Sequence, residues 1–393
     1  MSNFRIGSML RPAFIAPLLC LIYVLAVVNV YDDALAIVTI GSEFAPEELE
    51  NNEYTEKGYD GQFVYYLARY GIDSEAYIDV PSYRAQRILL PVLGRIVSFG
   101  QDSLLVWALL LVNLIALGGG TVLLEKLLVE HKANRWIALG FALSLGMFGA
   151  ARLITTETLA YALALGGIYL MRHNRWRWAA VIFALSVLSK EMTLFFPAAY
   201  GVYLLYQRKI PQAFIFGAIV LLPFIIWQGI LYNAFGSFGI GSGGAGTTGF
   251  AIVPFMGFIR LIIEPIRAGN TSAAIVLGLL MGMFVMLPTV WALWQVVADT
   301  RYTLQVRAGN KPESTIRGWS LMTWHLLTNI VIIPFVPLST FAEPLGMLRF
   351  IVGMQIMVIL YAAARRKKRA LSYSTFWFVT SFLVIVSDFA AVS

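Results

Sequence analysis

The stretch from Tyr59 to Pro91 carries the densest set of chemically active side chains in this sequence. Asp60 stands among aromatic residues at its start, and Arg84 and Arg87 lie three residues apart toward its end. Long apolar runs flank the stretch on both sides. Arginines bind phosphate oxygens, often through two parallel hydrogen bonds. An acid and two cations beside a membrane therefore predict the handling of a phosphate-bearing lipid.

Composition sets the class of protein that must position these residues. Of the 393 residues, 59% are hydrophobic and 13% are charged, whereas a soluble domain carries about 25% charged residues. Many apolar runs approach the roughly 20 residues that a helix needs to cross a bilayer. The sequence therefore predicts an all-α polytopic membrane protein. The alternating segments of about ten residues that a transmembrane β-barrel needs are absent.

Charge, cysteine and histidine content exclude several kinds of site. The net charge of +7 fits the excess of Lys and Arg in cytoplasmic loops, so it does not indicate nucleic-acid binding. Cys20 is the single cysteine, which rules out an intrachain disulfide. His131, His173 and His325 lie in separate segments without metal-ligand spacing. We therefore expect no metal site and assign no cofactor.

The first loop indicates the direction in which the chain crosses the membrane. Residues 32–79 contain twelve acidic residues and only two basic ones, whereas Arg5 and Arg11 precede the first apolar run. Basic residues concentrate in cytoplasmic loops. We therefore expect a cytoplasmic N-terminus and an extracytoplasmic first loop, residues 32–100, with amphipathic juxtamembrane helices.

The other apolar runs predict about eleven spans (ten to twelve) in one transmembrane domain, residues 1–393, of the cytoplasmic (inner) membrane. A Gly-rich outer loop and an interfacial helix are expected at residues 236–268. The expected spans are Pro12–Val30, Leu104–Leu124, Trp136–Ala150, a span that starts near Thr158, Trp178–Leu188, Met192–Tyr206, Ala213–Ala234, Ala273–Val297, Gly318–Val336, Leu348–Ala364 and Leu371–Phe389.

On this topology, ionisable residues gather at the extracytoplasmic ends of the spans. Charged groups at membrane depth are costly, so they mark functional sites by default. Because all of them face one side, we expect them to converge on one cavity. Besides the acid and the two arginines, its wall would include Tyr59, Gln62, Glu157, Lys190, Glu191, Glu343 and Arg349.

Four motifs resemble those of a known superfamily. They are YDGQ-x-x-YY from Tyr59, YR-x-x-RIL-x-P from Tyr83, TETL from Thr156 and LSKE-x-T from Leu188. Together they are similar to bacterial multi-pass proteins of the glycosyltransferase-C (GT-C) superfamily, relatives of enzymes that use polyprenyl-phosphate sugars. The resemblance covers most of the chain and is most specific in residues 59–91.

The resemblance implies a glycosyltransferase (hexosyl- or pentosyltransferase) that moves a sugar from a polyprenyl-phosphate donor to a glycan, lipid or protein acceptor on the outer face of the membrane. In that superfamily an acid of the first outer loop serves as catalytic base or acceptor anchor. Asp60 matches by motif, while Asp32 and Asp33 compete by position just after the first span. Basic residues downstream bind the donor phosphate, which implies this role for Arg84 and Arg87.

Each of these residues also has a purely structural interpretation. Asp60 could be a helix N-cap, and Arg84 and Arg87 could extend toward the membrane interface. Two pairs of nearby opposite charges could be ion pairs that tie helices together. These pairs are Lys190 with Glu191 and Glu343 with Arg349, while Asp32 and Asp33 could be ordinary loop acids.

Two other functions stay open. A transporter or flippase for a lipid-linked or anionic solute would place its charges near the membrane midplane and show repeated halves, whereas here the charges gather at the outer ends and no repeat is visible. A non-catalytic scaffold of a surface-polysaccharide assembly complex is the third interpretation. The Gly-rich segment GSFGIGSGGAGTTG lacks the Gly-Lys-Ser/Thr ending of a phosphate-binding loop, so it predicts a lid or linker.

Overall fold

The computed structural model describes residues 11–52, 55–244, 246, 248–312, 314 and 318–390. Within these ranges the chain forms α-helices joined by 3-10 and π-helical segments, and it contains no β-strand. Arg5, one of the two basic residues that oriented the N-terminus, lies outside the described residues. The expectation of an all-α chain is confirmed.

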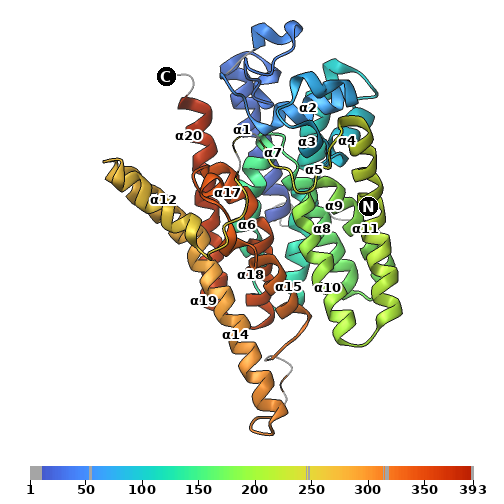
Figure 1. The fold of residues 1–393 in the computed structure, drawn as a ribbon, viewed down its shortest axis with the longest axis vertical. Helices are drawn as coiled ribbons and strands as arrows, with labels where there is room; N and C mark the ends of the chain where they lie inside the picture. Colours follow the sequence, from blue (N-terminus) through green and yellow to red (C-terminus); the bar gives the residue numbers. More distant parts are fainter. Residues whose placement is uncertain are drawn as a thin grey trace, which may run out of the picture.

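Twenty α-helices are present in the described part of the chain, and Figure 1 labels most of them. They are α1 Pro12–Tyr31, α2 Asp60–Tyr70, α3 Pro81–Ala85, α4 Leu89–Val97, α5 Asp102–Glu130, α6 Ala138–Ala142, α7 Ala150–Arg152, α8 Glu157–Arg172, α9 Trp176–Ser189, α10 Phe195–Tyr206, α11 Ile210–Phe235, α12 Met256–Arg267, α13 Thr271–Met281, α14 Leu287–Arg307, α15 Leu321–Ile330, α16 Leu338–Phe341, α17 Pro344–Phe350, α18 Val352–Ala364, α19 Lys368–Ser374 and α20 Phe382–Ala390.

Five helical segments are long and apolar enough to cross a membrane, so the chain is an all-α membrane protein. A sixth candidate is the pair α17 and α18, which is bent by 44°. Loss of one or two backbone hydrogen bonds is enough to redirect a helix in this way. The five segments are Pro12–Tyr31, Asp102–Glu130, Ile210–Phe235, Thr271–Arg307 and Lys368–Asp388.

The remaining expected spans are helical but short. Residues 136–150 divide into α6, a π-helical turn at Leu145–Gly149 and the start of α7. Helix α8 has 16 residues, which extend about 24 Å at 1.5 Å per residue, less than the roughly 30 Å of a hydrocarbon core. Eleven spans were expected, whereas the described residues contain five or six helices long enough to cross a membrane.

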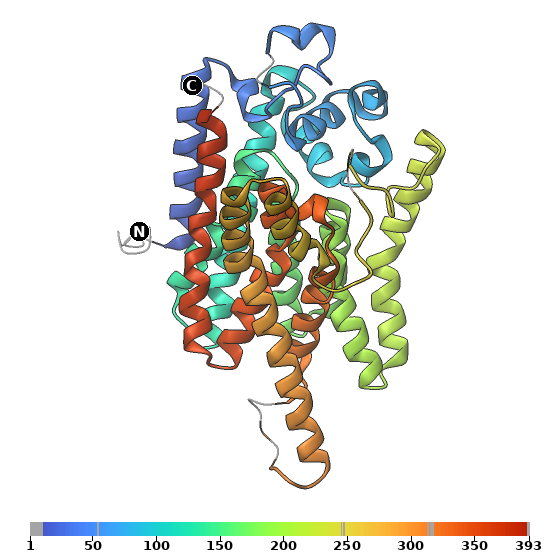
Figure 2. The ribbon, with the colours of Figure 1, turned by 60° about the vertical axis from the view of Figure 1, so that its left-hand side comes forward.

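Residues 32–100 form a cap on one end of the helix bundle, drawn in blue in Figures 1 and 2. We call this end of the bundle the loop end. The turn between α10 and α11 and the end of α14 lie at the opposite end. Under the cap, α1 packs against α5, α5 against α8, α8 against α9 and α9 against α11. These contacts bring segments far apart in the sequence to the underside of the cap.

The cap is held in place by α2, whose central residues Phe63, Tyr65, Tyr66 and Leu67 are buried. The apolar side chains of α2 therefore pack against other parts of the protein. At the start of α2, Gly61 comes so close to the backbone of Leu153 that a Cβ atom would lie 2.1 Å from its carbonyl oxygen. Only a residue without a side chain fits this contact, which fixes the distance between α2 and the chain after α7.

The Gly61→Ala substitution is expected to lower the free energy of unfolding by about 1–3 kcal/mol, the usual cost of overpacking. The matched control is Gly119→Ala in α5, where a Cβ would meet nothing within 4 Å. Alanine is the better helix former, so that variant should be as stable as the parent or slightly more stable. Thermal midpoints of the two detergent-solubilised variants test this, and equal midpoints would contradict the contact with Leu153.

Candidate active site

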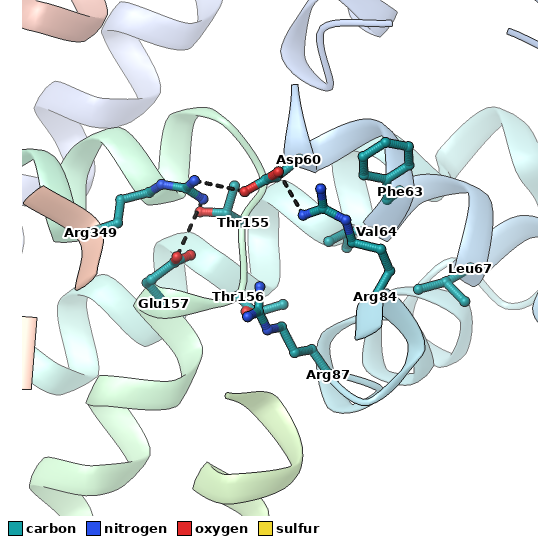
Figure 3. A pocket seen from close by; sticks show the side chains of 10 residues that line it. All are labelled: Asp60, Phe63, Val64, Leu67, Arg84, Arg87, Thr155, Thr156, Glu157 and Arg349. Atoms are coloured by element: carbon teal, nitrogen blue, oxygen red, sulfur yellow. Dashed lines mark hydrogen bonds and ion pairs between the residues drawn. The ribbon is translucent and has the colours of Figure 1, made fainter. Parts of the chain in front are cut away.

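Asp60 is the first residue of α2 and lies between two arginines (Figure 3). Its Oδ1 accepts a hydrogen bond from Nη1 of Arg84 at 2.7 Å, and its Oδ2 accepts one from Nη2 of Arg349, also at 2.7 Å. The N-cap position is occupied by Tyr59, and no side chain caps the helix. The interpretation of Asp60 as an N-cap is therefore wrong.

Arg84 is held in a fixed orientation by a second carboxylate. Its Nε and Nη2 donate to the two oxygens of Asp79 at 2.8 Å each, and its guanidinium carbon lies 4.5 Å from the ring centre of Phe63. The side chain is only 12% exposed. Arg84 is thus an anchored cation inside the cap, and the idea that it extends along lipid to the interface is wrong.

Arg87, three residues after Arg84, contacts Glu191 in the segment between α9 and α10. Its Nε and Nη2 donate to the two oxygens of Glu191 at 3.0 and 2.7 Å, and Nη2 also donates to the hydroxyl of Tyr83 at 2.8 Å. This two-pronged ion pair joins the cap to the bundle. Arg87 is equally enclosed, with 12% of its side chain exposed.

Arg349 of α17 connects the two acids of the site. Besides Asp60 it contacts Oε1 of Glu157 at 3.3 Å through Nη1, and its guanidinium lies 4.9 Å from the ring centre of Tyr59. Its Nε is buried without a hydrogen-bond partner among the described residues. Glu157 also accepts from Nζ of Lys190 at 2.6 Å. One donor of Arg349 is therefore buried and unpaired within the described part of the chain.

These side chains line a small cavity of about 20 Å³. We call it the ion-pair cavity. It is lined by Asp60, Phe63, Val64, Leu67, Arg84, Arg87, Thr155, Thr156, Glu157 and Arg349 (Figure 3). Five of the residues expected at the site thus meet in one place, although they come from four separate stretches of the chain.

The lining of the ion-pair cavity does not include three other expected residues, Lys190, Glu191 and Glu343. Lys190 and Glu191 pair with residues that line it and not with each other. Glu343 is exposed, and its Oε1 lies 3.5 Å from the hydroxyl of Tyr59. No ion pair joins Glu343 to Arg349. The two ion pairs expected from the sequence, Lys190 with Glu191 and Glu343 with Arg349, are therefore wrong. Lys190, Glu191 and Arg349 instead pair with residues in other segments of the chain.

Three expected residues fall outside the site. The side chain of Gln62 is buried and bonds to the backbone of Gly41 and Lys57, which ties the cap together. Asp33 accepts from the amide of Leu35 at 2.9 Å, and Asp32 is exposed just after α1. Neither of these two acids lines the ion-pair cavity, whereas Asp60 does. Asp60 is therefore the better candidate for the catalytic base or acceptor anchor.

Thr155 and Thr156 were not predicted as site residues, although Thr156 opens the TETL motif, and both line the ion-pair cavity beside Glu157. Their side chains face the arginines from the α8 side (Figure 3). The signal was present in the run of two threonines directly before Glu157. A polar pair in front of a charged residue at the start of an apolar helix is a reasonable indicator of a site.

The two arginines determine the protonation state of Asp60. Its burial by itself raises the pKa of the carboxyl, but the positive charges of Arg84 and Arg349 outweigh this and hold the pKa well below its usual range. A carboxylate stabilised by opposite charges stays ionised and binds protons weakly. While both arginines contact it, Asp60 is therefore an anion and a poor base.

An apolar groove adjoins the ion-pair cavity and shares Leu67 with it. It runs between α2, α4 and α11 and has a volume of about 470 Å³. Its walls are mainly apolar, and Ile72, Val92 and Ile230 are exposed along it. The indole nitrogen of Trp227, another wall residue, donates to the carbonyl of Ala85 at 2.9 Å and so fixes α11 against α3.

The Gly-rich segment after α11 crosses the outside of the site. The amides of Gly239 and Ile240 donate to Oε1 of Gln228 at 2.8 and 3.1 Å. A Cβ on Gly239 would lie 2.5 Å from the carbonyl oxygen of Ser82, so the segment rests directly on α3. Gly244 lies near the Arg84 guanidinium. The segment therefore covers α3, a position that suits the expected lid.

No protein-family model matches this chain, and no curated protein or solved structure matches it either. The chemistry of the site must accordingly come from its own residues. Within the described ranges, no group of three or more His, Cys, Asp or Glu side chains could hold a metal ion. In the ion-pair cavity a ligand would meet the carboxylate of Asp60 between the guanidinium groups of Arg84 and Arg349, and an apolar groove lies next to the cavity.

Proposed function

We propose that the chain is a membrane glycosyltransferase that moves a sugar from a polyprenyl-phosphate donor to a hydroxyl acceptor at the loop end of the bundle. The observation that carries the proposal is that the ion-pair cavity and the apolar groove lie next to each other, with Leu67 in the lining of both. A lipid phosphate has the same two parts, a compact anion and a long apolar chain. Enzymes bind such ligands in largely apolar clefts with a few well-placed polar groups.

Arg84, Arg87 and Arg349 are the donor-phosphate ligands in this proposal. All three guanidinium groups are enclosed, which strengthens their attraction for an anion compared with arginines in water. The free Nε of Arg349 supplies one hydrogen bond directly. The others become available as phosphate oxygens replace the carboxylate oxygens of Asp60 on Arg84 and Arg349.

The proposed reaction is a displacement at the anomeric carbon of the donor sugar. The acceptor hydroxyl oxygen forms a bond to that carbon, and the bond from the carbon to the phosphate oxygen breaks. Its electron pair leaves with the polyprenyl phosphate, whose negative charge the arginines stabilise. The hydroxyl proton passes to Asp60, which becomes a stronger base once phosphate oxygens have replaced it on Arg84 and Arg349 and the phosphate charge offsets theirs.

Transport is the second candidate, and it is favoured by the helix breaks around the site. The 44° bend between α17 and α18 lies next to Arg349, and a π-helical turn precedes α7. Transporters bind ions and substrates on discontinuous helices of this kind. A transporter would bind the lipid phosphate and leave its sugar in place.

The proposal is tested with the purified full chain in nanodiscs and a panel of radiolabelled polyprenyl-phosphate sugars. The expected result is binding together with release of free polyprenyl phosphate in the presence of acceptor extracts. Binding without release would overturn the transferase and favour transport. Absence of both across the panel would favour a scaffold of a polysaccharide assembly complex.

The apolar groove gives a sharper prediction for Ile230→Gln. Burying an isoleucine side chain is worth about 1.5–3 kcal/mol, so a polar side chain in the groove should weaken binding of polyprenyl phosphate by at least about tenfold. Binding of inorganic phosphate should not change. The control is Ile225→Gln on the same helix, which is exposed but does not line the groove. Equal affinities of both variants for polyprenyl phosphate would place the lipid chain elsewhere.

A further inference from the structure

A second polar cavity lies beside the ion-pair cavity, between the cap, α1 and α20. Its volume is about 100 Å³. Its lining is rich in hydroxyl groups, from Tyr31, Thr39, Thr55, Tyr59 and Ser387. We call it the hydroxyl cavity. Thr55 and Ser387 are exposed, so it opens to the outside of the chain.

The two cavities share their walls. Three short stretches each supply residues to both: Tyr59 and Asp60, Leu153 and Thr155, and Leu345 and Arg349. Tyr59 lines the hydroxyl cavity, and its ring centre lies 4.9 Å from the guanidinium of Arg349, which lines the ion-pair cavity. A ligand in the hydroxyl cavity would therefore be one aromatic ring away from the phosphate ligands.

The floor of the hydroxyl cavity is a buried ion pair between Arg152 and Asp388. The guanidinium donates to both carboxylate oxygens, at 3.0 and 2.7 Å, and to the carbonyl of Ile37 at 2.9 Å. The hydroxyl of Tyr23 donates to the same carboxylate at 2.7 Å. Figure 2 shows that α20, in red, runs alongside α1, in blue, where this network forms.

This floor selects against a charged ligand. Each nitrogen of Arg152 already donates to a protein oxygen, and Asp388 neutralises its charge. Among the described residues, an anion would therefore find no unpaired cation in the hydroxyl cavity. What the hydroxyl cavity offers is neutral donors and acceptors together with the apolar face of an aromatic ring.

We propose that the hydroxyl cavity binds the sugar-like acceptor, a neutral polyol whose hydroxyl groups meet Thr39, Thr55 and Ser387 and whose ring packs on Tyr59. This inference rests on the proposed function, because it assigns the acceptor of that reaction to the side of Tyr59 opposite the donor phosphate. Tyr59 directly precedes Asp60 in the chain, so the acceptor would bind beside the proposed base.

The test uses the full chain in nanodiscs and three neutral probes: the methyl α-glycosides of glucose, galactose and mannose. Binding is read by saturation-transfer NMR. We expect at least one glycoside to bind and the signal to fall at least fivefold in Ser387→Phe, which fills the mouth of the cavity, and in Thr39→Val. The control is Val386→Phe, the exposed neighbour on α20 that does not line the hydroxyl cavity, and it should bind as the parent does.

The outcomes separate this inference from the proposed function. Polyprenyl phosphate binding without any glycoside signal, or an equal signal in all four proteins, would overturn the acceptor site and leave the donor site standing. Displacement of the glycoside by inorganic phosphate would overturn it as well, since the glycoside would then occupy the ion-pair cavity. A glycoside signal that responds to Ser387→Phe but no binding of polyprenyl phosphate would support the hydroxyl cavity and overturn the donor.

Discussion

Arg349→Met is expected to lower the free energy of unfolding by about 3–5 kcal/mol, the range for a buried ion pair that loses one partner. The reason is that Arg349 serves two acids at once: Asp60 at 2.7 Å and Glu157 at 3.3 Å. Methionine fills much of the same volume, so packing changes little. Glu157, with 2% of its side chain exposed, would keep only Lys190 as a neighbouring cation.

Thermal unfolding in detergent measures this effect, with Arg260→Met as the matched control. Arg260 also forms an ion pair, with Glu264 at 2.6 Å, but its side chain is 55% exposed. Exposed pairs contribute about 0–1 kcal/mol, so the control should unfold near the parent midpoint. If both variants unfolded at the same temperature, Arg349 would not hold the cap on the bundle.

Asp60→Asn is expected to have opposite effects on the two steps of the proposed reaction. Sugar transfer should fall by about 10²–10⁴-fold, the usual loss when a general base is removed. Donor binding should become tighter, because Asp60 competes with the donor phosphate for Arg84 and Arg349. A residue with a purely structural role would not produce this combination.

The measurements are transfer rates under single-turnover conditions and affinities for polyprenyl phosphate in nanodiscs. Glu130→Gln is the control, since Glu130 also pairs with an arginine, Arg172 at 2.7 Å, outside the ion-pair cavity. It should leave both quantities unchanged. Unchanged transfer by Asp60→Asn, or weaker donor binding, would remove Asp60 from the proposed mechanism.

Helix content and the membrane class followed from the sequence because they depend on local properties. Apolar runs such as Pro12–Tyr31 and Ile210–Phe235 are visible as hydrophobic segments, and both form long helices. The number of spanning helices was less predictable. Whether residues 136–150 continue as one helix depends on the π-helical turn at Leu145–Gly149 and its packing against α17, which hydrophobicity does not encode.

For the site, the sequence indicated individual residues but not which of them form ion pairs. Asp60, Arg84 and Arg87 were indicated by residue type and by their position beside apolar runs. Their partners were not, because opposite charges adjacent in the sequence were natural candidates for pairing. The fold instead pairs Lys190 with Glu157 and Glu191 with Arg87, since the chain reverses direction between α9 and α10 and points the two side chains toward different segments.

An α-helical membrane protein with a large acidic loop and ionisable residues at helix ends could be predicted without any structure. Those conclusions rest on composition and on the cost of placing charges in lipid. Three features emerge only from the packed helices: Asp60 shares its carboxylate between Arg84 and Arg349, Asp32 and Asp33 lie elsewhere, and Tyr59 lines a hydroxyl cavity. They depend on contacts between residues up to 365 positions apart, and such contacts form only when the helices pack.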